Sequence, residues 1–175
     1  MYKIESAGIP LGKLATCISF GAATGADKVF LLKNAEDLDS KTVLAESRFL
    51  DDVFVFESSI LKPILRGRHI SGYTSPEPET LCIFPYDKTG DLIAEDMLQT
   101  EFPRTYKYLE FCQSYLGSRK LKDGQPWYAF RNEDVSQFIQ SPKIIASVVN
   151  SGGGFTLDRY QHLFCNNSVI FVSID

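Results

Sequence analysis

The sequence lacks the features by which metal and membrane proteins are most easily identified. It has only two histidines, His69 and His162, and neither has a second His or Cys at metal-ligand spacing, so zinc is not indicated. The four cysteines lie far apart without a Cys-x-x-Cys pair, which favours buried free thiols over disulfides or zinc. The longest apolar runs, 29–32 and 144–149, are far shorter than the roughly 20 residues of a membrane helix.

Targeting and catalytic motifs are also missing. Residues 1–5 lack the basic start and apolar core of a signal peptide, so we expect a cytoplasmic protein. There is no nucleophile-elbow pattern, no Gly-x-Gly-x-x-Gly loop and no Walker A motif, since two residues separate Gly25 from Lys28. Catalytic groups that meet only in space stay open. We predict that this chain is not catalytic on its own and carries no cofactor.

The composition is that of a folded domain with uneven charge. With 175 residues, 44% of them hydrophobic, the chain can bury the core of one domain. Its net charge of −4 argues against non-specific nucleic-acid binding as its sole function. The acidic residues are concentrated in 36–57, however, whereas 62–69 and 104–131 have an excess of Lys and Arg. A locally basic face is compatible with this distribution.

Residues 59–70 hold the tightest cluster of cations in the chain. On a helix the apolar side chains of this segment share one side: Ile60, Leu61, Ile64 and Leu65. Lys62 and Arg66 fall on the opposite side, and Arg68 and His69 follow at the exit. We predict about two helical turns that end at Gly67, and a basic corner that can bind phosphates or guanine edges. Alternatively, the corner braces loops through ion pairs with the acidic segment.

Two further segments have a structural and a functional interpretation. The loop 21–28 is typical of a tight hairpin, or of a loop in which Thr24 and Lys28 contact a phosphate backbone. Residues 125–131 alternate aromatic side chains with a cation. Trp127 and Arg131 can form a stacking platform for a base or a partner, and Trp127 fits a buried core equally well.

Hydrophobic patterns predict short strands separated by turns, with few helices. The expected strands are 14–20, 28–33, 53–56, 80–86, 142–149, 155–158 and 168–174, and the expected helices are 94–99 and 102–121. Residues 34–50 are expected to be a solvated connector. A chain that stops within a strand suggests an excised domain.

Four blocks of this sequence resemble the TaqI-like C-terminal specificity domain of adenine-type DNA methyltransferases. The blocks are Gly21-Ala-Ala-Thr-Gly-Ala-Asp-Lys-Val-Phe30, Leu61-Lys-Pro-Ile-Leu-Arg-Gly-Arg-His-Ile70, Phe102-Pro-Arg-Thr-Tyr-Lys-Tyr-Leu109 running on to Arg119, and Trp127-Tyr128 with Pro142-Lys143-Ile144-Ile145. They span roughly residues 10–170, and the second is the most specific. The domain is the target-recognition module of these methyltransferases and of Type IIG restriction-modification enzymes.

The resemblance implies an α/β fold with a mixed, largely antiparallel twisted sheet and a few helices. It implies that residues 1–175 are a single target-recognition domain, the C-terminal part of a larger enzyme. Its partners would be double-stranded DNA and an N-terminal methyltransferase domain of the same chain, which binds S-adenosylmethionine and flips out the adenine. The catalytic Asn/Asp-Pro-Pro-Tyr signature of that domain is absent here.

The side chains expected at the DNA are Lys62, Arg66, Arg68, His69, Thr24, Lys28, Trp127 and Arg131. Lys62, Arg66 and Arg68 would supply phosphate contacts or a bidentate guanine contact, and Thr24 and Lys28 would position the backbone. Two other functions stay open. One is a domain of a Type I specificity subunit, and the other is a protein-docking or regulatory module without DNA contact, which the acidic net charge and abundant aromatics would suit.

Overall fold

The strands of this protein form two sheets. The structure, a computed structural model, describes residues 8–70, 72, 77–131, 135–139, 142–149, 154–159, 164–165 and 167–174. The small sheet has the strand order β1 (Ala15–Phe20), β10 (Val169–Ile174), β7 (Lys143–Ser147) and β8 (Phe155–Asp158). The large sheet has the order β4 (Asp52–Glu57), β3 (Thr42–Ser47), β2 (Leu31–Asp37), β6 (Thr80–Ile83), β5 (Leu61–Leu65) and β9 (Phe164–Cys165).

The fold class predicted from the sequence is confirmed. Among the described strands every pairing is antiparallel except that of β5 with β9, so the fold is mixed and largely antiparallel. The helices are short: α2 (Leu11–Leu14), α3 (Asp27–Phe30), α4 (Glu95–Glu101), α5 (Pro103–Phe111), α6 (Gln113–Gly117) and α7 (Ser136–Ile139), with the 3₁₀ turns η1 (Ser58–Ile60) and η2 (Gly67–His69). No helix in the described ranges is long and apolar enough to cross a bilayer.

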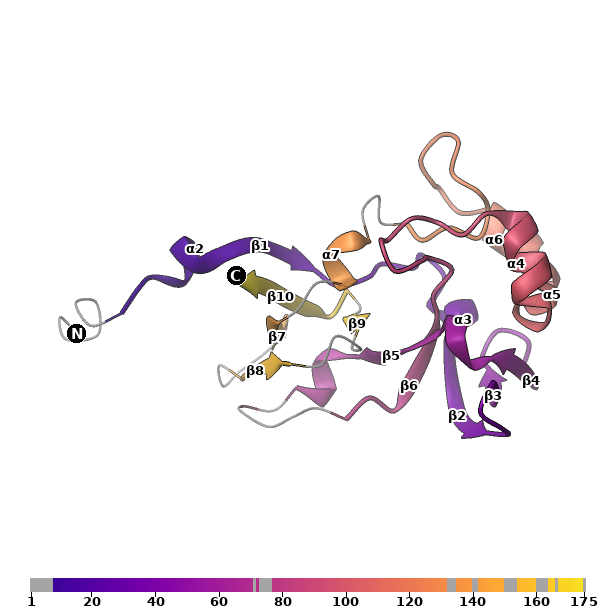
Figure 1. Cartoon of the computed structure of the whole chain (residues 1–175), viewed down its shortest axis with the longest axis horizontal. Coiled ribbons are helices and arrows are strands. Elements are labelled where there is room, and N and C mark those ends of the chain that lie inside the picture. Colours follow the sequence, from indigo (N-terminus) through magenta and orange to yellow (C-terminus); the bar gives the residue numbers. More distant parts are fainter. Residues whose placement is uncertain are drawn as a thin grey trace.

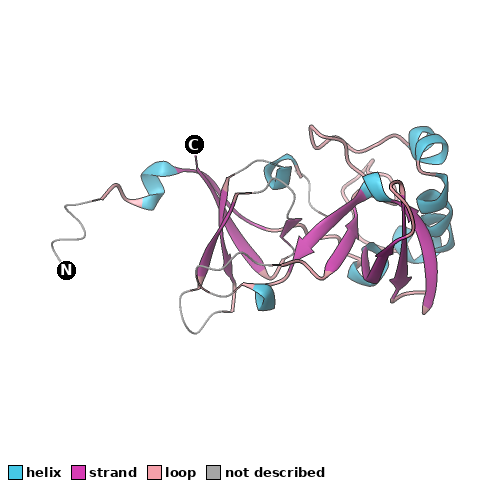
Figure 2. Cartoon of the chain, turned by 60° about the horizontal axis from the view of Figure 1, so that its bottom comes forward, coloured by secondary structure: helices cyan, strands magenta, loops and turns pink. Residues whose placement is uncertain are grey.

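Helices α4, α5 and α6 gather at one end of the molecule, and the small sheet lies at the other (Figures 1 and 2). Tyr108 of α5 is buried and joins the helices to the large sheet. Its hydroxyl lies 2.7 Å from Ser47 Oγ and donates to the Val29 carbonyl at 2.8 Å. Its ring packs edge-on against Phe54 and Phe56 of β4, with centroids 5.1 and 5.0 Å away. Tyr108 thereby packs into the main hydrophobic core.

The start of α5 is held by a residue far away in the sequence. Pro103 occupies the first helical position, and Phe102, where the sequence predicted the helix to begin, is its N-cap. The carboxylate of Glu57, at the end of β4, accepts hydrogen bonds from the backbone N–H groups of Arg104 and Thr105, both at 3.0 Å. A carboxylate at a helix N-terminus satisfies free N–H groups and complements the helix dipole. The β4 strand therefore fixes where the helix begins.

The prediction of a helix over residues 59–70 is wrong. The apolar residues of this segment are buried as expected, but residues 61–65 form strand β5 between β6 and β9. An apolar run of this length fits a strand buried on both faces as well as a helix, and tertiary pairing decides between them. Pro63 is tolerated because β9 pairs only with Ile64 and Leu65, so Pro63 lies beyond this short strand.

Three other expectations need correction. Residues 34–50, predicted as a solvated connector, contain the end of β2 and all of β3, because their alternating apolar residues Val43 and Ala45 are buried. The strand expected at 28–33 begins as helix α3 and becomes β2 only at Leu31. The helix expected over 102–121 is divided at Cys112 into α5 and α6. Cys82 and Cys112 are buried free thiols, as predicted.

The inner face of the small sheet contains a buried ion pair. Lys143 and Asp158 are cross-strand partners in β7 and β8. Lys143 Nζ lies 3.8 Å from Asp158 Oδ2, and the two side chains are 2% and 1% exposed. Taking two charges out of water is costly unless they remain paired. The register of β7 and β8 is therefore linked to this pair.

Replacing Lys143 by Met is expected to lower the free energy of unfolding by about 3–5 kcal/mol, because it leaves Asp158 as a buried carboxylate without its cation. Replacing both residues, Lys143→Met with Asp158→Leu, should restore most of that loss. Urea unfolding followed by circular dichroism measures both effects. Lys107→Met, at an exposed lysine of α5, is the control and should change stability by less than about 0.5 kcal/mol. Equal losses in Lys143→Met and Lys107→Met would contradict the assignment.

Candidate nucleic-acid interface

The basic corner predicted at residues 66–69 exists, built on turn η2 rather than on a helix end. Gly67 is needed here for a close approach, since a Cβ at this position would lie 2.5 Å from Ser147 Oγ and 2.9 Å from the Ser168 carbonyl oxygen. The Gly67 N–H donates to Ser168 Oγ at 2.8 Å. The glycine therefore lets η2 pack against the ends of β7 and β10, with Arg66 on one side of it and Arg68 on the other.

Arg66 is half-buried, and its guanidinium is only partly satisfied by the protein. Its Nε atom is buried and donates no hydrogen bond within the described residues. Burial lowers the pKa of Arg66 from its ordinary value, and the charges of Arg68 and Arg48 lower it further, while Asp27 acts in the opposite direction. Two arginines, Arg68 of the same turn and Arg48 from a distant part of the sequence, are thus close enough to Arg66 to repel it. An anion bound between them would relieve that repulsion.

His69 is a structural neighbour of this cluster rather than a further cation. Burial lowers the pKa of His69, the nearby charge of Arg68 lowers it again, and Glu79 partly offsets the two. The imidazole Nδ1 accepts the Arg66 backbone N–H at 3.3 Å. The Nε2 atom accepts from Arg68 Nε at 3.1 Å and lies 3.7 Å from Glu79 Oε2. Since a neutral imidazole accepts at only one nitrogen, the hydrogen bonds at Nδ1 and Nε2 belong to its two alternative tautomers. His69 thus supports the turn in its neutral form.

An open groove of about 560 Å³ lies beside the corner. Its lining residues come from η2 on one side and from the β7 and β10 ends on the other: Arg66, Gly67, Arg68, Ser147, Val148, Val149, Asn167 and Ser168. Arg68 is the most exposed cation of this groove, with 61% of its side chain accessible, and its contact with Glu79 at 3.9 Å is loose. Such surface ion pairs contribute little energy, so Arg68 can exchange Glu79 for another anion.

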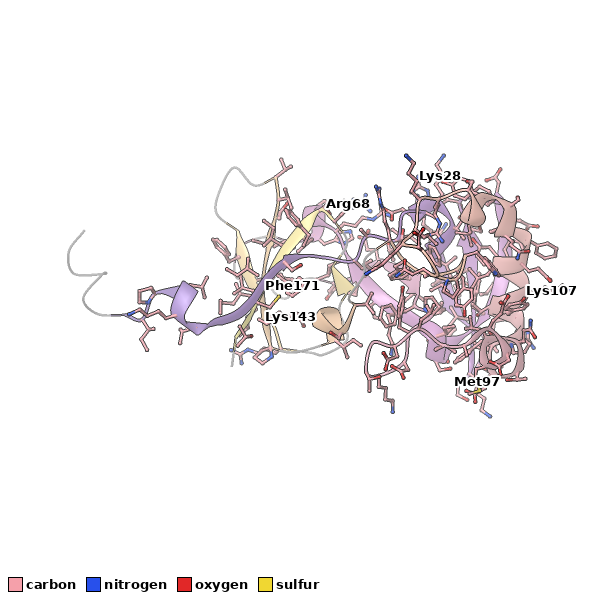
Figure 3. All side chains as sticks on the ribbon, turned by 90° about the horizontal axis from the view of Figure 1, so that it is seen from above. Lys28, Arg68, Met97, Lys107, Lys143 and Phe171 are labelled. Atoms are coloured by element: carbon pink, nitrogen blue, oxygen red, sulfur yellow. The ribbon has the colours of Figure 1, made fainter. Side chains whose placement is uncertain are left out.

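The glycine loop 21–26 places two more cations next to this corner. Gly25 has φ +69°, and a Cβ there would lie 3.3 Å from the Arg131 Cβ, so the loop and Arg131 pack closely. The Arg131 N–H donates to the Ala23 carbonyl at 3.0 Å. Lys28 follows on α3 and is exposed. Figure 3 shows Lys28 and Arg68 projecting from the same edge of the molecule.

Thr24 does not reach the surface. It is fully buried, and its hydroxyl donates to Asp27 Oδ1 at 2.6 Å while accepting the Ala26 N–H at 3.0 Å. Its carbonyl accepts a hydrogen bond from Arg119 Nη1 at 2.6 Å. Thr24 therefore shapes the loop that carries Lys28, and its hydroxyl is not available to a phosphate.

Arg119 holds the glycine loop and the aromatic segment together. Besides Thr24, it donates from Nη2 to the Trp127 carbonyl at 2.5 Å and from Nε to the Leu116 carbonyl at 2.9 Å. Its guanidinium also lies over the Phe30 ring, 5.4 Å from the centroid. Burial lowers the pKa of Arg119, and the nearby side chains of Tyr86 and Tyr115 act in the opposite direction. Arg119 therefore connects three segments of the chain.

Two of the predicted site residues lie elsewhere. Lys62 lines a separate groove together with Met97, and Figure 3 places Met97 at the edge opposite Lys28 and Arg68. On a strand Lys62 and Arg66 are about 13 Å apart, whereas a helix would have made them neighbours. Trp127 donates from Nε1 to Glu95 Oε1 at 3.3 Å and packs edge-on against Tyr128, so it supports the helical end.

We call the basic face the set Lys28, Arg48, Arg66, Arg68 and Arg131. Four of these were expected from the sequence, and Arg48 was missed because it lies next to the acidic stretch 34–46 in the linear sequence. Only the turn after β3 brings it near Arg66. Among the described residues, no group of three or more His, Cys, Asp or Glu side chains is placed to hold a metal ion.

The chain is similar to a restriction-modification protein. It is 21% identical over 174 residues to the Escherichia coli Type II restriction enzyme and methyltransferase RM.Eco57I. The match covers 91% of this chain and 17% of that protein, so this chain corresponds to a small part of a much longer polypeptide. No family model matches the chain. The similarity relates the chain to a domain of a restriction-modification protein.

Replacing Arg119 by Met is expected to lower the free energy of unfolding by more than about 2 kcal/mol, because three hydrogen bonds from a charged donor are lost and the carbonyls of Thr24 and Trp127 lose their partner. Thermal unfolding measures the change. The matched control is Lys120→Met, which removes one exposed cation from the adjacent position and should have almost no effect. Similar losses in the two variants would contradict the role of Arg119.

The pKa of His69 is expected to be below its ordinary value of 6.5. Arg68→Met should raise this pKa, because it removes a neighbouring positive charge, and Glu79→Gln should lower it further, because it removes a negative one. Histidine NMR titrations, with His69→Gln to assign the resonance, measure all three values. A wild-type pKa at or above 6.5, or shifts of the same sign in the two variants, would contradict this arrangement.

Proposed function

We propose that this chain is the sequence-specific DNA target-recognition domain of a restriction-modification DNA (adenine-N6) methyltransferase. It positions duplex DNA for a separate catalytic domain. Support comes from the four sequence blocks that resemble TaqI-like specificity domains and from the similarity to a protein named as a restriction enzyme and methyltransferase. The structure adds a surface with the chemistry that duplex DNA requires.

The proposal depends mainly on one observation, which is that the guanidinium of Arg66 is partly buried and has an Nε donor without a partner among the described residues. This guanidinium lies next to the charges of Arg48 and Arg68 and beside an open groove. Charge-assisted hydrogen bonds to phosphate or guanine are strong, and arginine has the planar fork that suits both. A partly desolvated arginine among like charges favours an anionic ligand.

The acidic net charge of the chain does not oppose this role. The acidic residues at the end of β2, Glu36 and Asp37, lie at the far end of a seven-residue strand that starts directly after α3. At about 3.3 Å per residue, this strand carries them roughly 20 Å from Lys28, about two Debye lengths at physiological salt. The carboxylates close to the five cations of the basic face are instead those of Asp27 and Glu79, which the cations outnumber.

The cations of the basic face divide into two groups. Four of them, Lys28, Arg48, Arg68 and Arg131, are exposed and can follow the phosphate backbone, so they provide affinity and steering. Arg66 is fixed by its burial, and His69 supports the adjacent turn, so Arg66 is the better candidate for a guanine contact. Thr24 and Trp127 contribute indirectly, because they hold the loops from which Lys28 and Arg131 project.

Catalysis belongs to another domain in this proposal. The parent protein is a methyltransferase of the Type IIG or a related class. Its N-terminal domain binds S-adenosylmethionine and contains the Asn/Asp-Pro-Pro-Tyr motif that this chain lacks. That domain extrudes the adenine, and the domain described here sets which duplex sequence is presented to it. A Type I specificity subunit would use the same kind of domain without a methyltransferase in the same polypeptide.

The chain is expected to bind duplex DNA through the basic face, with an affinity that falls steeply as salt rises. Arg68→Met should weaken binding and reduce the slope of log K against log [salt] by about one, because it removes one phosphate contact, and Arg66→Met should also weaken binding. If Arg66 contacts a guanine, Arg66→Met should also cost about 1–3 kcal/mol at the preferred site only. Fluorescence anisotropy with duplexes selected from a randomised pool measures both.

Lys107→Met is the matched control, since it removes one exposed cation from the helical end of the molecule (Figure 3). It should leave the affinity and the salt slope unchanged. If Arg66→Met and Arg68→Met behave like Lys107→Met, the basic face is not the DNA interface. If the wild-type chain does not bind duplex DNA even at low salt, and no sequence is enriched from the pool, a protein-docking module becomes the better interpretation.

A further inference from the structure

The outer face of the small sheet is apolar across all four strands. The pairings align two cross-strand rows, and directly opposed residues of antiparallel strands share a face. The first row is Ile18, Val172, Ile144 and Leu157, and the second is Phe20, Ile170, Ala146 and Phe155. We call these eight residues the apolar face. None of them can form a hydrogen bond through its side chain.

The apolar face lies open at both edges of the sheet. The exposed fractions are 62% for Ile18 and 55% for Phe20 on β1, and 48% for Phe155 and 38% for Leu157 on β8. These four residues are not isolated on the surface. The two rows join them to the apolar residues of the central strands β10 and β7, so that they form one contiguous patch. A contiguous apolar patch on a sheet is typical of a surface that packs against something else.

The two sides of the small sheet do not divide into an apolar inner side and a polar outer side. A one-sided antiparallel sheet normally buries its apolar residues and exposes its polar ones. Here the inner side buries apolar residues such as Ile145 and Phe171 together with polar ones such as Lys143, whereas the outer side presents the apolar face where polar residues are the rule. This pattern is expected when both sides of the sheet are covered in the working protein.

DNA does not fit as the partner of this face. The apolar face contains no cation, and a polyanion gains nothing from it. Arg66 and Arg68 project from η2, which packs beside Ser147 on the other side of the sheet, as the close approach of Gly67 shows. The basic face and the apolar face therefore serve different partners.

The ends of the chain indicate which partner covers this face. The described chain enters the small sheet on β1 and leaves it on β10, and these two strands are neighbours (Figure 1). Just before β1, Leu11 and Leu14 of α2 are 42% and 45% exposed and extend the apolar surface. Any polypeptide that precedes or follows this domain is tethered to the small sheet, and this tether gives it a high effective concentration at the apolar face. The RM.Eco57I protein, of which the match covers 17%, has such flanking sequence.

We propose that the apolar face is the docking surface for a flanking part of the same polypeptide in the longer protein. This inference rests on the proposed function, because it takes the chain to be one domain of a larger enzyme. The occupant presents an apolar helix or sheet surface that stacks on the four strands at the usual spacing of about 10 Å. Docking on this side leaves the basic face free and fixes its orientation relative to the rest of the enzyme.

Hydroxyl-radical footprinting tests the proposal on two proteins, the 175-residue chain and the full product of the natural gene. Ile18, Phe20, Phe155 and Leu157 should be oxidised rapidly in the 175-residue chain and at least several-fold more slowly in the full product. Phe111 of α5, which is 58% exposed, is the matched internal control and should react equally in both. Phe20→Ser should lower the Tm of the full product and leave that of the 175-residue chain unchanged, whereas Phe111→Ser should change neither.

Equal oxidation of the apolar face in the two proteins would overturn the proposal, as would a gene that encodes residues 1–175 alone. Protection in the 175-residue chain that grows with concentration, together with a dimer in sedimentation, would identify a second copy as the occupant and also overturn it. The proposed function is tested separately, because DNA binding by the 175-residue chain does not require the apolar face. Protection in the full product without any DNA binding would reject the proposed function and retain the docking surface.

Discussion

The hydrogen bonds of Arg119 are the interaction on which the arrangement of the basic face depends. One guanidinium accommodates three backbone carbonyls, those of Leu116, Thr24 and Trp127, and lies over the Phe30 ring. A half-buried cation is stable there only because carbonyl oxygens replace the lost water. The end of α6, the glycine loop and the segment before Arg131 are thereby fixed relative to one another. Lys28 and Arg131 project from the two segments that Arg119 joins.

The molecule separates its charged and apolar surfaces between the two sides of the small sheet. Turn η2 brings Arg66 and Arg68 to the end of β7 on the inner side, where Gly67 allows the close contact with Ser147. The outer side presents two apolar rows that run across all four strands. The proposed function calls for two such surfaces, because phosphates and apolar partners require opposite chemistry. The buried pair of Lys143 and Asp158 lies between them.

The fold was largely predictable from local patterns, and the errors have physical causes. The strands expected at 53–56 and 168–174 and the helix start expected at 102 were located to within one residue, because apolar periodicity and proline act over a few residues. The strand expected at 80–86 ends earlier, at Ile83. Residues 61–65 were assigned to a helix because a short apolar run fits both structures. The partner that caps α5 was also missed, since Glu57 lies 47 residues before Arg104 and no local pattern connects them.

The sequence by itself determined the composition of the site: an Arg-Gly-Arg corner, a glycine loop followed by Lys28, and Arg131 after an aromatic run. It also carried the resemblance to recognition domains, because that depends on the order of residues. Only the tertiary structure decided which of these side chains share a face. The tertiary structure places Arg48 close to Arg66 and places Lys62 in a separate groove. It also buries the side chain of Thr24. These outcomes depend on strand register and on contacts between distant segments, which local spacing does not specify.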